Sequence, residues 1–432
     1  MNPAHVDNFA DRCIAHTCAL RLLALLAVLA FSTFNAGAQT FSVLHTFTGG
    51  GDGIEPSAGV TIDRGGNLYG TSNGGGGDGV AYKLTNRSGN WILNPLLHFD
   101  GLDGSFPDAR PTIAADGTLY GTTMDGGSQS CEIVGCGVVY HLTPPVSICS
   151  SVNCPWSVSL PWMFTFSTGQ GDTPNYGDLL FDLAGNIYGV TLNGTNSSGV
   201  VYKLTQSGGA WAYSPLHLFE SGNDGIFPES GLIMDAVGNL YGTAYFGGSG
   251  GCSPHACGVV YEVSPSGSGW TEKVIYSFRN GTDGANPLAG LVLDAAGNLY
   301  GAATIGGANG GGTIFELSPS GSHWTFSTLY SFTASGSGPC DDASGPTGAM
   351  VMDSAGNLYG NTCTNGAYGF GAIFRLSPSN GGWSYLSLHD FTDGNDGAWP
   401  AGTVSLGRDG KLYGTAGGGG ANQLGTVWEI TP

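Results

Sequence analysis

The chain has 432 residues, of which 77 are glycine, and it carries a formal net charge of −20. Only 12 Lys and Arg stand against 32 Asp and Glu. The sequence contains no basic cluster, which argues against nucleic acid and anionic membrane surfaces as partners. The glycines recur in register with apolar and aromatic runs, so the composition excludes a disordered chain and indicates many tight turns.

Residues 1–38 have the pattern of a secretory signal. Two arginines precede an apolar run at 22–34, and Ala36-Gly37-Ala38 fits a small-residue cleavage site. No later run is long and apolar enough to span a membrane as a helix. We therefore expect a secreted protein, extracellular or periplasmic, whose mature chain is 39–432.

One five-residue pattern, Gly-Asn-Leu-Tyr-Gly with close variants, recurs along the whole mature chain. Each repeat of about 50 residues divides into four short β-branched and aromatic runs bounded by Gly, Pro, Asn and Ser, which is a strand pattern. Four strands in a repeat of this length are typical of a propeller blade. The seven copies begin at Gly66, Gly117, Gly185, Gly238, Gly297, Gly356 and Gly410.

The order of the strands within a blade can also be predicted. The first run of each repeat, such as 291–293, is apolar at successive positions, so we expect it to be the innermost strand, buried on both faces. The mature chain begins with a fourth-strand pattern at 41–47 and ends with a third-strand pattern at 425–430. Pairing these two segments closes the ring. We predict an all-β fold, one seven-bladed β-propeller of four-stranded blades over 39–432.

Eight cysteines remain after the signal. Three pairs have C-x4-C spacing, and an even count in an exported chain favours disulfides over a zinc site, which needs four converging ligands. The predicted pairs are Cys131 with Cys136, Cys149 with Cys154, Cys252 with Cys257, and Cys340 with Cys363.

The repeat unit resembles a known family. Its form is Asp-x-x-Gly-Asn-Leu-Tyr-Gly-Thr-x-x-x-Gly-Gly followed by Gly-Val-Val-Tyr-x-Leu-x-Pro, which is similar to the GloVer tandem repeat over essentially all of 41–432. The resemblance implies an exported bacterial protein and implies no particular activity. Members of the family can carry different C-terminal anchors. This sequence ends at Pro432 without an apolar tail or basic cluster, so we expect no such anchor.

Aspartates recur at two positions of the repeat. One set, exemplified by Asp353, lies in the turn between the first and second strands, where a carboxylate accepts backbone N–H groups. The second set lies between blades, where turn capping is the favoured interpretation and calcium binding is the alternative, because Asp and loop carbonyls are suitable hard ligands. No other cofactor is expected. The candidate calcium ligands are Asp52, Asp103, Asp224, Asp283 and Asp396.

The loops between second and third strands and the connections between blades emerge on the same end of a propeller. Three of the predicted disulfides fall there, so we call this end the stapled loop face. Its aromatic side chains either plug the grooves between blades, which is the favoured interpretation, or form a stacking platform for sugars or peptides. They are Phe106, Phe227, Trp399, Tyr245, Phe246 and Tyr368.

These patterns predict an exported, monomeric, non-catalytic propeller that binds a carbohydrate or protein ligand through the stapled loop face. The alternatives are an extracellular enzyme, either a glycoside hydrolase or lyase or a lactonase, and a purely structural envelope protein. An enzyme is expected to carry acids or histidines that break the repeat near the central mouth. None is identified from the sequence: Glu132, Glu220 and Glu229 are non-repeated acids, and nothing selects them.

Overall fold

The structure is a computed structural model, and residues 41–432 belong to one unit. It describes residues 39–432 apart from short gaps, so the predicted signal at 1–38 lies outside the described residues. The gaps are 76, 129–130, 132–134, 146–155, 166–168, 176, 195–197, 221, 253–255 and 336–344.

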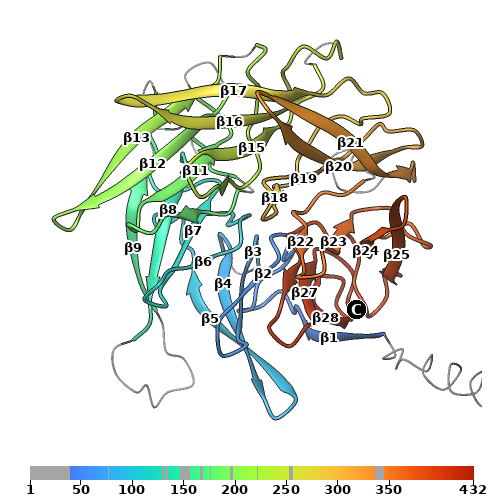
Figure 1. The fold of residues 1–432 in the computed structure, drawn as a ribbon. Helices are drawn as coiled ribbons and strands as arrows, with labels where there is room; N and C mark the ends of the chain where they lie inside the picture. The colour runs from blue at the N-terminus through green and yellow to red at the C-terminus, as the bar shows by residue number, and fades with distance from the viewer. Residues whose placement is uncertain are drawn as a thin grey trace, which may run out of the picture. The chain divides into compact units, whose positions relative to one another are not determined.

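Seven four-stranded antiparallel sheets are arranged in a ring (Figure 1). No helix occurs within the described part of 39–432. The predicted seven-bladed β-propeller is therefore confirmed. Blade 1 consists of β2 (Val60–Ile62), β3 (Leu68–Ser72), β4 (Val80–Arg87) and β5 (Asn90–His98). Blade 2 consists of β6 (Thr112–Ile113), β7 (Leu119–Thr123), β8 (Val138–Thr143) and β9 (Ser157–Met163). Blade 3 consists of β10 (Leu180–Phe181), β11 (Ile187–Thr191), β12 (Val200–Ser207) and β13 (Ala210–Leu218).

Blades 4 to 6 repeat this order, and blade 7 is assembled from both ends of the chain. Blade 4 consists of β14 (Ile233–Met234), β15 (Leu240–Ala244), β16 (Val259–Ser266) and β17 (Gly269–Ser277). Blade 5 consists of β18 (Val292–Leu293), β19 (Leu299–Ala303), β20 (Gly310–Ser320) and β21 (His323–Thr333). Blade 6 consists of β22 (Val351–Met352), β23 (Leu358–Thr362), β24 (Ala372–Ser379) and β25 (Gly382–Asp390). Blade 7 consists of β26 (Ser405–Leu406), β27 (Leu412–Ala416), β28 (Thr426–Thr431) and β1 (Thr40–Thr46).

The ring closes where β1 pairs with β28, as the sequence predicts. Directly after β1, the backbone N–H of Phe47 donates a hydrogen bond to the carbonyl of Gly425 at 3.1 Å. The ring of Phe41 lies 6.3 Å from that of Trp428 in the same blade. Because the closing contacts are backbone pairing and apolar packing, blade 7 is stabilised in the same way as the other six.

The aspartate of the repeat organises the turn between the first two strands. In blade 6, one carboxylate oxygen of Asp353 accepts the N–H groups of Ala355 and Asn357, both at 2.9 Å. The other oxygen accepts the side-chain amide of Asn357 at 2.7 Å and the hydroxyl of Tyr359 at 3.0 Å. The Asp, Asn and Tyr of the repeat therefore form one hydrogen-bonded unit, and the turn interpretation is confirmed.

The two glycines of the repeat have different physical roles. The first, Gly238 in blade 4, has φ +93° in the turn, and no atom would lie within 4 Å of an added Cβ. The second, Gly242, lies under a side chain of the third strand: an added Cβ would sit 2.5 Å from the hydroxyl oxygen of Tyr261. The first glycine thus supplies a left-handed conformation, and the second supplies space.

The expectation that the first strand of each blade is buried on both faces is wrong. It is the innermost strand, but β10, β14, β18 and β22 are half-buried, whereas the second strand of every blade is buried at all five positions. The first strand borders the centre of the ring, while the second lies within the sheet between neighbouring blades.

Neighbouring blades are joined by pairs of aromatic rings. A tryptophan near the start of the fourth strand contacts the repeat tyrosine of the preceding blade, as Trp324 contacts Tyr241 at 6.0 Å between ring centroids. The same edge-on contact joins Trp383 to Tyr300 at 6.1 Å. Such edge-to-face pairs contribute on the order of 1 kcal/mol beyond the area they bury. The tryptophan and tyrosine of the repeat therefore hold one blade to the next.

A buried hydroxyl in this core provides a stability prediction. The hydroxyl of Tyr202 in β12 is buried and has no hydrogen-bond partner among the described residues. Phe315 and Phe374 occupy the same position in blades 5 and 6. Tyr202→Phe is expected to raise the free energy of unfolding by about 1 kcal/mol, because an unsatisfied buried polar group is removed. Urea denaturation would check this, and a loss of stability would show that the hydroxyl has a partner.

Candidate functional site

The residue before the proline that recurs in each repeat fixes the connection between two blades. Phe227 has φ +59°; its N–H donates to the carbonyl of Ser198 in the preceding blade at 3.2 Å, and its carbonyl accepts from Tyr245 N–H at 3.0 Å. Trp399 makes the equivalent contacts with Phe370 and Gly417. This double contact places the following segment at the centre of the ring. The non-glycine residues with positive φ at this position are Glu55, Phe106, Thr173, Phe227, Asn286 and Trp399.

These segments enclose a central cavity of about 890 Å³, lined by residues of all seven blades. Its wall has two layers. The upper layer comes directly after the proline and includes Ser57, Asp108, Glu229, Leu288, Thr347 and Ala401. The lower layer lies just before the first strand and includes Arg110, Asp178, Gly231, Gly290, Ala349 and Thr403.

The lower layer carries one ion pair where the other blades have small residues. The Nε of Arg110 donates to Asp178 at 2.5 Å, and its Nη1 donates to the hydroxyl of Ser405 at 2.8 Å. The side chains of Arg110 and Asp178 are 24% and 25% exposed, so both border the cavity. Burial within the ring raises the pKa of Asp178, although Arg110 opposes this shift. One guanidinium therefore links blades 2, 3 and 7 around the cavity.

The upper layer adds an acid with a strongly shifted pKa. Asp108 is only 8% exposed and accepts a hydrogen bond from the side-chain amide of Asn73. Burial, together with the charges of Asp125 and Glu55, raises the pKa of Asp108 to about 7, against the opposing effect of Asn73. Its carboxyl group is thus poised between the neutral and the ionised form near neutral pH.

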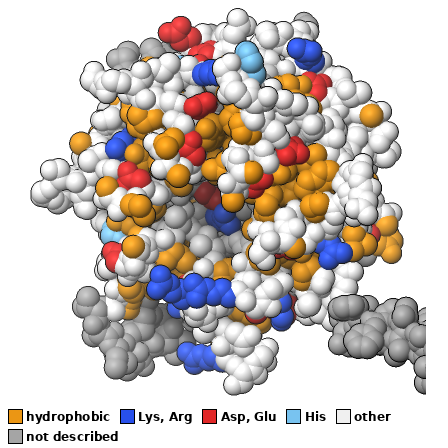
Figure 2. Space-filling view, viewed as in Figure 1, with side chains coloured by type: hydrophobic (Ala, Val, Ile, Leu, Met, Phe, Trp, Pro, Cys, Tyr) orange, Lys and Arg blue, Asp and Glu red, His pale blue; other side chains and the backbone are white. Residues whose placement is uncertain are grey.

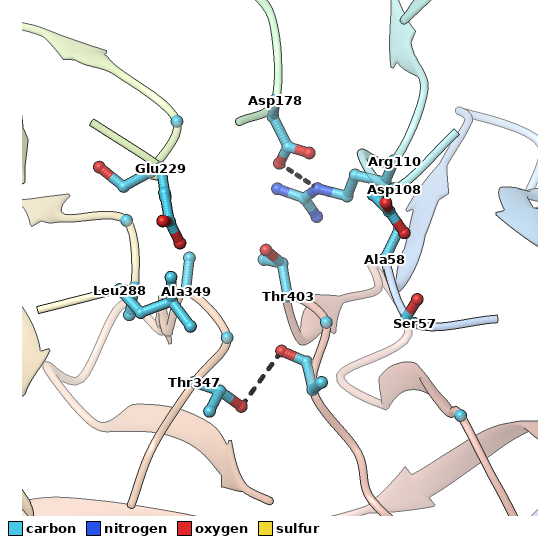
Figure 3. Close-up of a pocket in the computed structure, with 18 of the residues that line it drawn as sticks. Ser57, Ala58, Asp108, Arg110, Asp178, Glu229, Leu288, Thr347, Ala349 and Thr403 are labelled. Atoms are coloured by element: carbon cyan, nitrogen blue, oxygen red, sulfur yellow. Dashed lines mark hydrogen bonds and ion pairs between the residues drawn. The ribbon is translucent and has the colours of Figure 1, made fainter. Parts of the chain in front are cut away.

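The charged groups of the two layers come from three consecutive blades. In Figure 3, Asp178 lies at the top with Arg110 and Asp108 to its right, and Glu229 lies at the left above Leu288 and Ala349. The lining contains four acids, which include Glu55 at the mouth, and one arginine. Figure 2 shows the hollow at the centre of this face, with a basic and an acidic side chain within it and apolar groups around it.

The aromatic residues proposed from the sequence divide into two groups. Trp399 and Tyr245 line the cavity. The other four are not among the lining residues. The ring of Phe227 packs 6.1 Å from that of Phe246, whereas Phe106 and Tyr368 are 40% and 63% exposed. Of the six aromatic residues proposed from the sequence, Trp399 and Tyr245 therefore border the cavity.

The aspartates proposed as calcium ligands close the connections between blades. Asp52 accepts the N–H of Thr48 at 2.9 Å and pairs with His45 at 3.1 Å. In two other connections His217 pairs with Asp224 and His389 pairs with Asp396 in the same way. In a further connection, Asp283 accepts a hydrogen bond from the hydroxyl of Tyr276. One carboxylate oxygen of each of Asp103, Asp224 and Asp396 likewise accepts a backbone N–H group, from Asp100, Glu220 and Thr392 respectively.

Metal binding at these aspartates stays a prediction. No group of three or more His, Cys, Asp or Glu side chains that can hold a metal ion occurs among the described residues. The hydrogen bonds of the connections account for the repeated His or Tyr seven residues before the aspartate, because both side chains donate to it.

Two of the predicted disulfides are formed. Cys131 is bonded to Cys136 and Cys252 to Cys257, with Cα atoms 5.1 and 5.2 Å apart. Cys363 is disulfide-bonded, and its predicted partner at 340 lies outside the described residues. The predicted pair at 149 and 154 also lies outside them. The two described bridges sit in loops between second and third strands, as expected for the stapled loop face.

Sequence reasoning missed the residues at the centre of this cavity. Glu229 is recognisable as a non-repeated acid, but Asp108, Arg110 and Asp178 were not identified. A signal was present: the segments after the recurring prolines carry charged residues in only three blades, whereas the other blades have Gly, Ala, Ser, Leu or Thr at these positions. Aligning these segments by their prolines would have shown the departure from the repeat.

Comparison with solved structures finds matches at low sequence identity. A gluconolactonase from Xanthomonas campestris is 13% identical, with 91% of this chain and 90% of that chain covered, at a TM-score of 0.43. A putative 6-phosphogluconolactonase from Bacteroides uniformis is 12% identical, with coverage of 78% and 85% and a TM-score of 0.46. At these values the likeness carries no information about activity.

In the described part of the chain, no helix is long and apolar enough to cross a membrane.

Comparison of the sequence with known families identifies one match. No curated protein sequence matches the chain. The family model of the Gloeobacter/Verrucomicrobia repeat, the GloVer repeat, matches residues 134–341 and 339–432, more than half of the chain. Together with the repeated turn and the glycines that its packing requires, this match shows that the chain belongs to the Gloeobacter/Verrucomicrobia repeat family.

Proposed function

We propose that the protein is an exported binding propeller that takes a carbohydrate ligand in its central cavity. One observation carries the proposal: the blades depart from their common pattern at the cavity wall, where they place Asp108, Arg110, Asp178 and Glu229 around a space of about 890 Å³. A volume of this order suits a small ligand or a short oligosaccharide. Packing alone does not require charged groups at these positions, since other blades have small or apolar residues there.

The chemistry of the lining suits a polyhydroxylated ligand. Each sugar hydroxyl both donates and accepts, and the cavity offers an arginine as donor beside carboxylates as acceptors. Trp399 at the mouth provides a flat apolar surface of the kind that stacks on a sugar ring. Because four acids face one arginine, we expect neutral or amino sugars to bind in preference to uronic acids.

A binding assay with a matched pair of variants tests this proposal. Purified 39–432 is incubated with cellulose, chitin, xylan, starch and cell-wall material, and both depletion of the protein and release of sugar are measured. Trp399→Ala is expected to weaken binding about 5- to 150-fold, which corresponds to losing an aromatic contact worth about 1–3 kcal/mol. Phe227→Ala is the control, because Phe227 occupies the same backbone position but does not line the cavity. Equal losses in both variants would contradict the cavity as the site.

An enzymatic role is the second candidate, and Asp108 is the observation that favours it. A carboxyl group with a pKa of about 7 beside a cavity is suited to general acid or base catalysis near neutral pH. The substrate would then be a glycoside or a lactone, with water as the second reactant. Sugar release in the assay above that disappears in Asp108→Asn would establish this role in place of simple binding.

Export and a monomeric state complete the proposal. The disulfides Cys131–Cys136 and Cys252–Cys257 support an oxidising compartment outside the cytoplasm. If no polysaccharide depletes the protein from solution, a protein partner replaces a carbohydrate as the expected ligand.

A further inference from the structure

We infer that the cavity receives its carbohydrate end-on: the ligand is a chain terminus or a free short saccharide, and not an internal segment of a polysaccharide. This inference rests on the proposed function and specifies the form in which the carbohydrate binds. It follows from the shape of the wall and from the depth at which the charged groups lie.

The wall closes around the cavity on all sides. The lining includes residues from each of the seven blades, and the ring itself is completed by the pairing of β1 with β28. A sugar chain that lies across an open groove enters and leaves at its two sides. Here a chain lying across the mouth meets blades in every direction, so its internal units stay above the wall.

Two of the four charged groups that distinguish this cavity from a plain apolar channel lie deeper than the other two. Asp108 and Glu229 belong to the upper layer. Arg110, which lies two residues after Asp108 and so about 6–7 Å further along at strand spacing, belongs to the lower layer with Asp178. Tyr245 and Trp399 come from the loops and connections at the mouth. A ligand that uses both sets of contacts must extend from the mouth into the cavity.

The arginine retains donors for such a ligand. A guanidinium carries five N–H groups. In Arg110, Nε donates to Asp178 and Nη1 donates to Ser405. Its Nη2 has no hydrogen-bond partner among the described residues. In Figure 3 the guanidinium points toward the middle of the view, above Thr403, with Ala349 to the left. Terminal sugar hydroxyls are the groups expected to reach it.

A chain-length series on the wild-type protein tests the inference directly. Isothermal titration compares free sugars, oligomers of two to six units and polymers built from the sugar that binds best among glucose, xylose and N-acetylglucosamine. If termini bind, affinity per mole of chain stays within about threefold across the series, so a polymer of about 100 units binds about 100-fold more weakly per sugar unit. If internal segments bind, affinity per sugar unit stays constant, and the inference is overturned.

A plug variant supplies an independent readout. Ala349→Phe fills the lower layer opposite Arg110 without removing a charge, and it is expected to weaken binding of the disaccharide at least 10-fold. Ala236→Phe, on an exposed turn at the opposite end of blade 4, is the matched control and is expected to bind normally. Thermal denaturation of both confirms folding. Unchanged binding in Ala349→Phe would place the ligand above the wall and contradict the inference.

The two proposals fail in different ways. If no free sugar, oligomer or polymer binds the wild-type protein, the carbohydrate function itself is wrong, and the inference falls with it. If a carbohydrate binds with constant affinity per sugar unit, the function stands and end-on entry is wrong.

Discussion

Gly242→Ala is expected to destabilise the propeller severely, by about 3 kcal/mol or more, because the added Cβ would overlap a buried ring. It would lie 2.5 Å from the hydroxyl oxygen and 2.6 Å from Cζ of Tyr261, and 3.1 Å from Cδ2 of Leu232. Tyr261 has no room to withdraw, since it is fully buried and packs against Phe219 at 5.1 Å between ring centroids. Equilibrium denaturation in urea, followed by tryptophan fluorescence, measures the change.

Another glycine of the same repeat is the control. Gly238→Ala introduces a side chain at φ +93° but meets no atom within 4 Å, so it is expected to cost about 1–2 kcal/mol through backbone strain alone. Combining Gly242→Ala with Tyr261→Leu removes the overlapping ring and is expected to recover part of the loss. If Gly238→Ala is the more damaging of the two single changes, the assignment of space to one glycine and conformation to the other is wrong.

Asp108→Asn is expected to stabilise the protein at pH 8 and to leave its stability unchanged at pH 4. The folded state raises the pKa of Asp108 to about 7, so folding disfavours the ionised form. The penalty is absent below the unfolded-state pKa near 4, grows as pH rises, and is complete above about pH 7; a shift of about three units corresponds to roughly 4 kcal/mol. Asparagine is neutral throughout and keeps an oxygen that accepts from Asn73. Urea denaturation of both proteins at pH 4, 6 and 8 gives the difference at each pH.

The neighbouring acid separates the effect of burial from the effect of an ion pair. Burial raises the pKa of Asp178 as it does that of Asp108, but Arg110 opposes the rise at Asp178, and Asp178→Asn leaves Arg110 without its charged partner. Asp178→Asn is therefore expected to stabilise the protein at pH 8 less than Asp108→Asn does. A destabilising effect of Asp108→Asn would mean that its ionised form is held by a partner and that its pKa is not raised.

The fold was predictable because its causes repeat. Asp353 and Asn357 of one turn have counterparts in most blades, and a pattern present many times is distinguishable from chance. Closure was predictable because the two terminal patterns, a spare fourth strand and a missing one, complement each other. The burial of the first strand was mispredicted, since an apolar run does not reveal that one side of the strand borders a cavity.

The site was less predictable because it consists of departures from the repeat. A search for regularity gives little weight to single exceptions such as Arg110. The ring then brings distant exceptions together: Arg110 and Asp178 are 68 positions apart, and Arg110 and Ser405 are 295 apart. Such distances in sequence give no local signal, so only the closed structure shows that these groups share one cavity. The aromatic residues illustrate the same limit, since Trp399 and Phe227 have equivalent positions and only one lines the space.

The composite seventh blade has a consequence for how the protein is made. β1 emerges from the ribosome before the other described strands, whereas its hydrogen-bonding partner β28 emerges after them. Six blades can form from neighbouring segments as they appear, but the seventh requires closure of a loop of several hundred residues, which is slow compared with local pairing. Until then β1 has no partner and the open ring exposes a strand edge at each end. The step that completes the wall of the central cavity is therefore also the last step in forming the ring, and a complete cavity requires that β28 has been made.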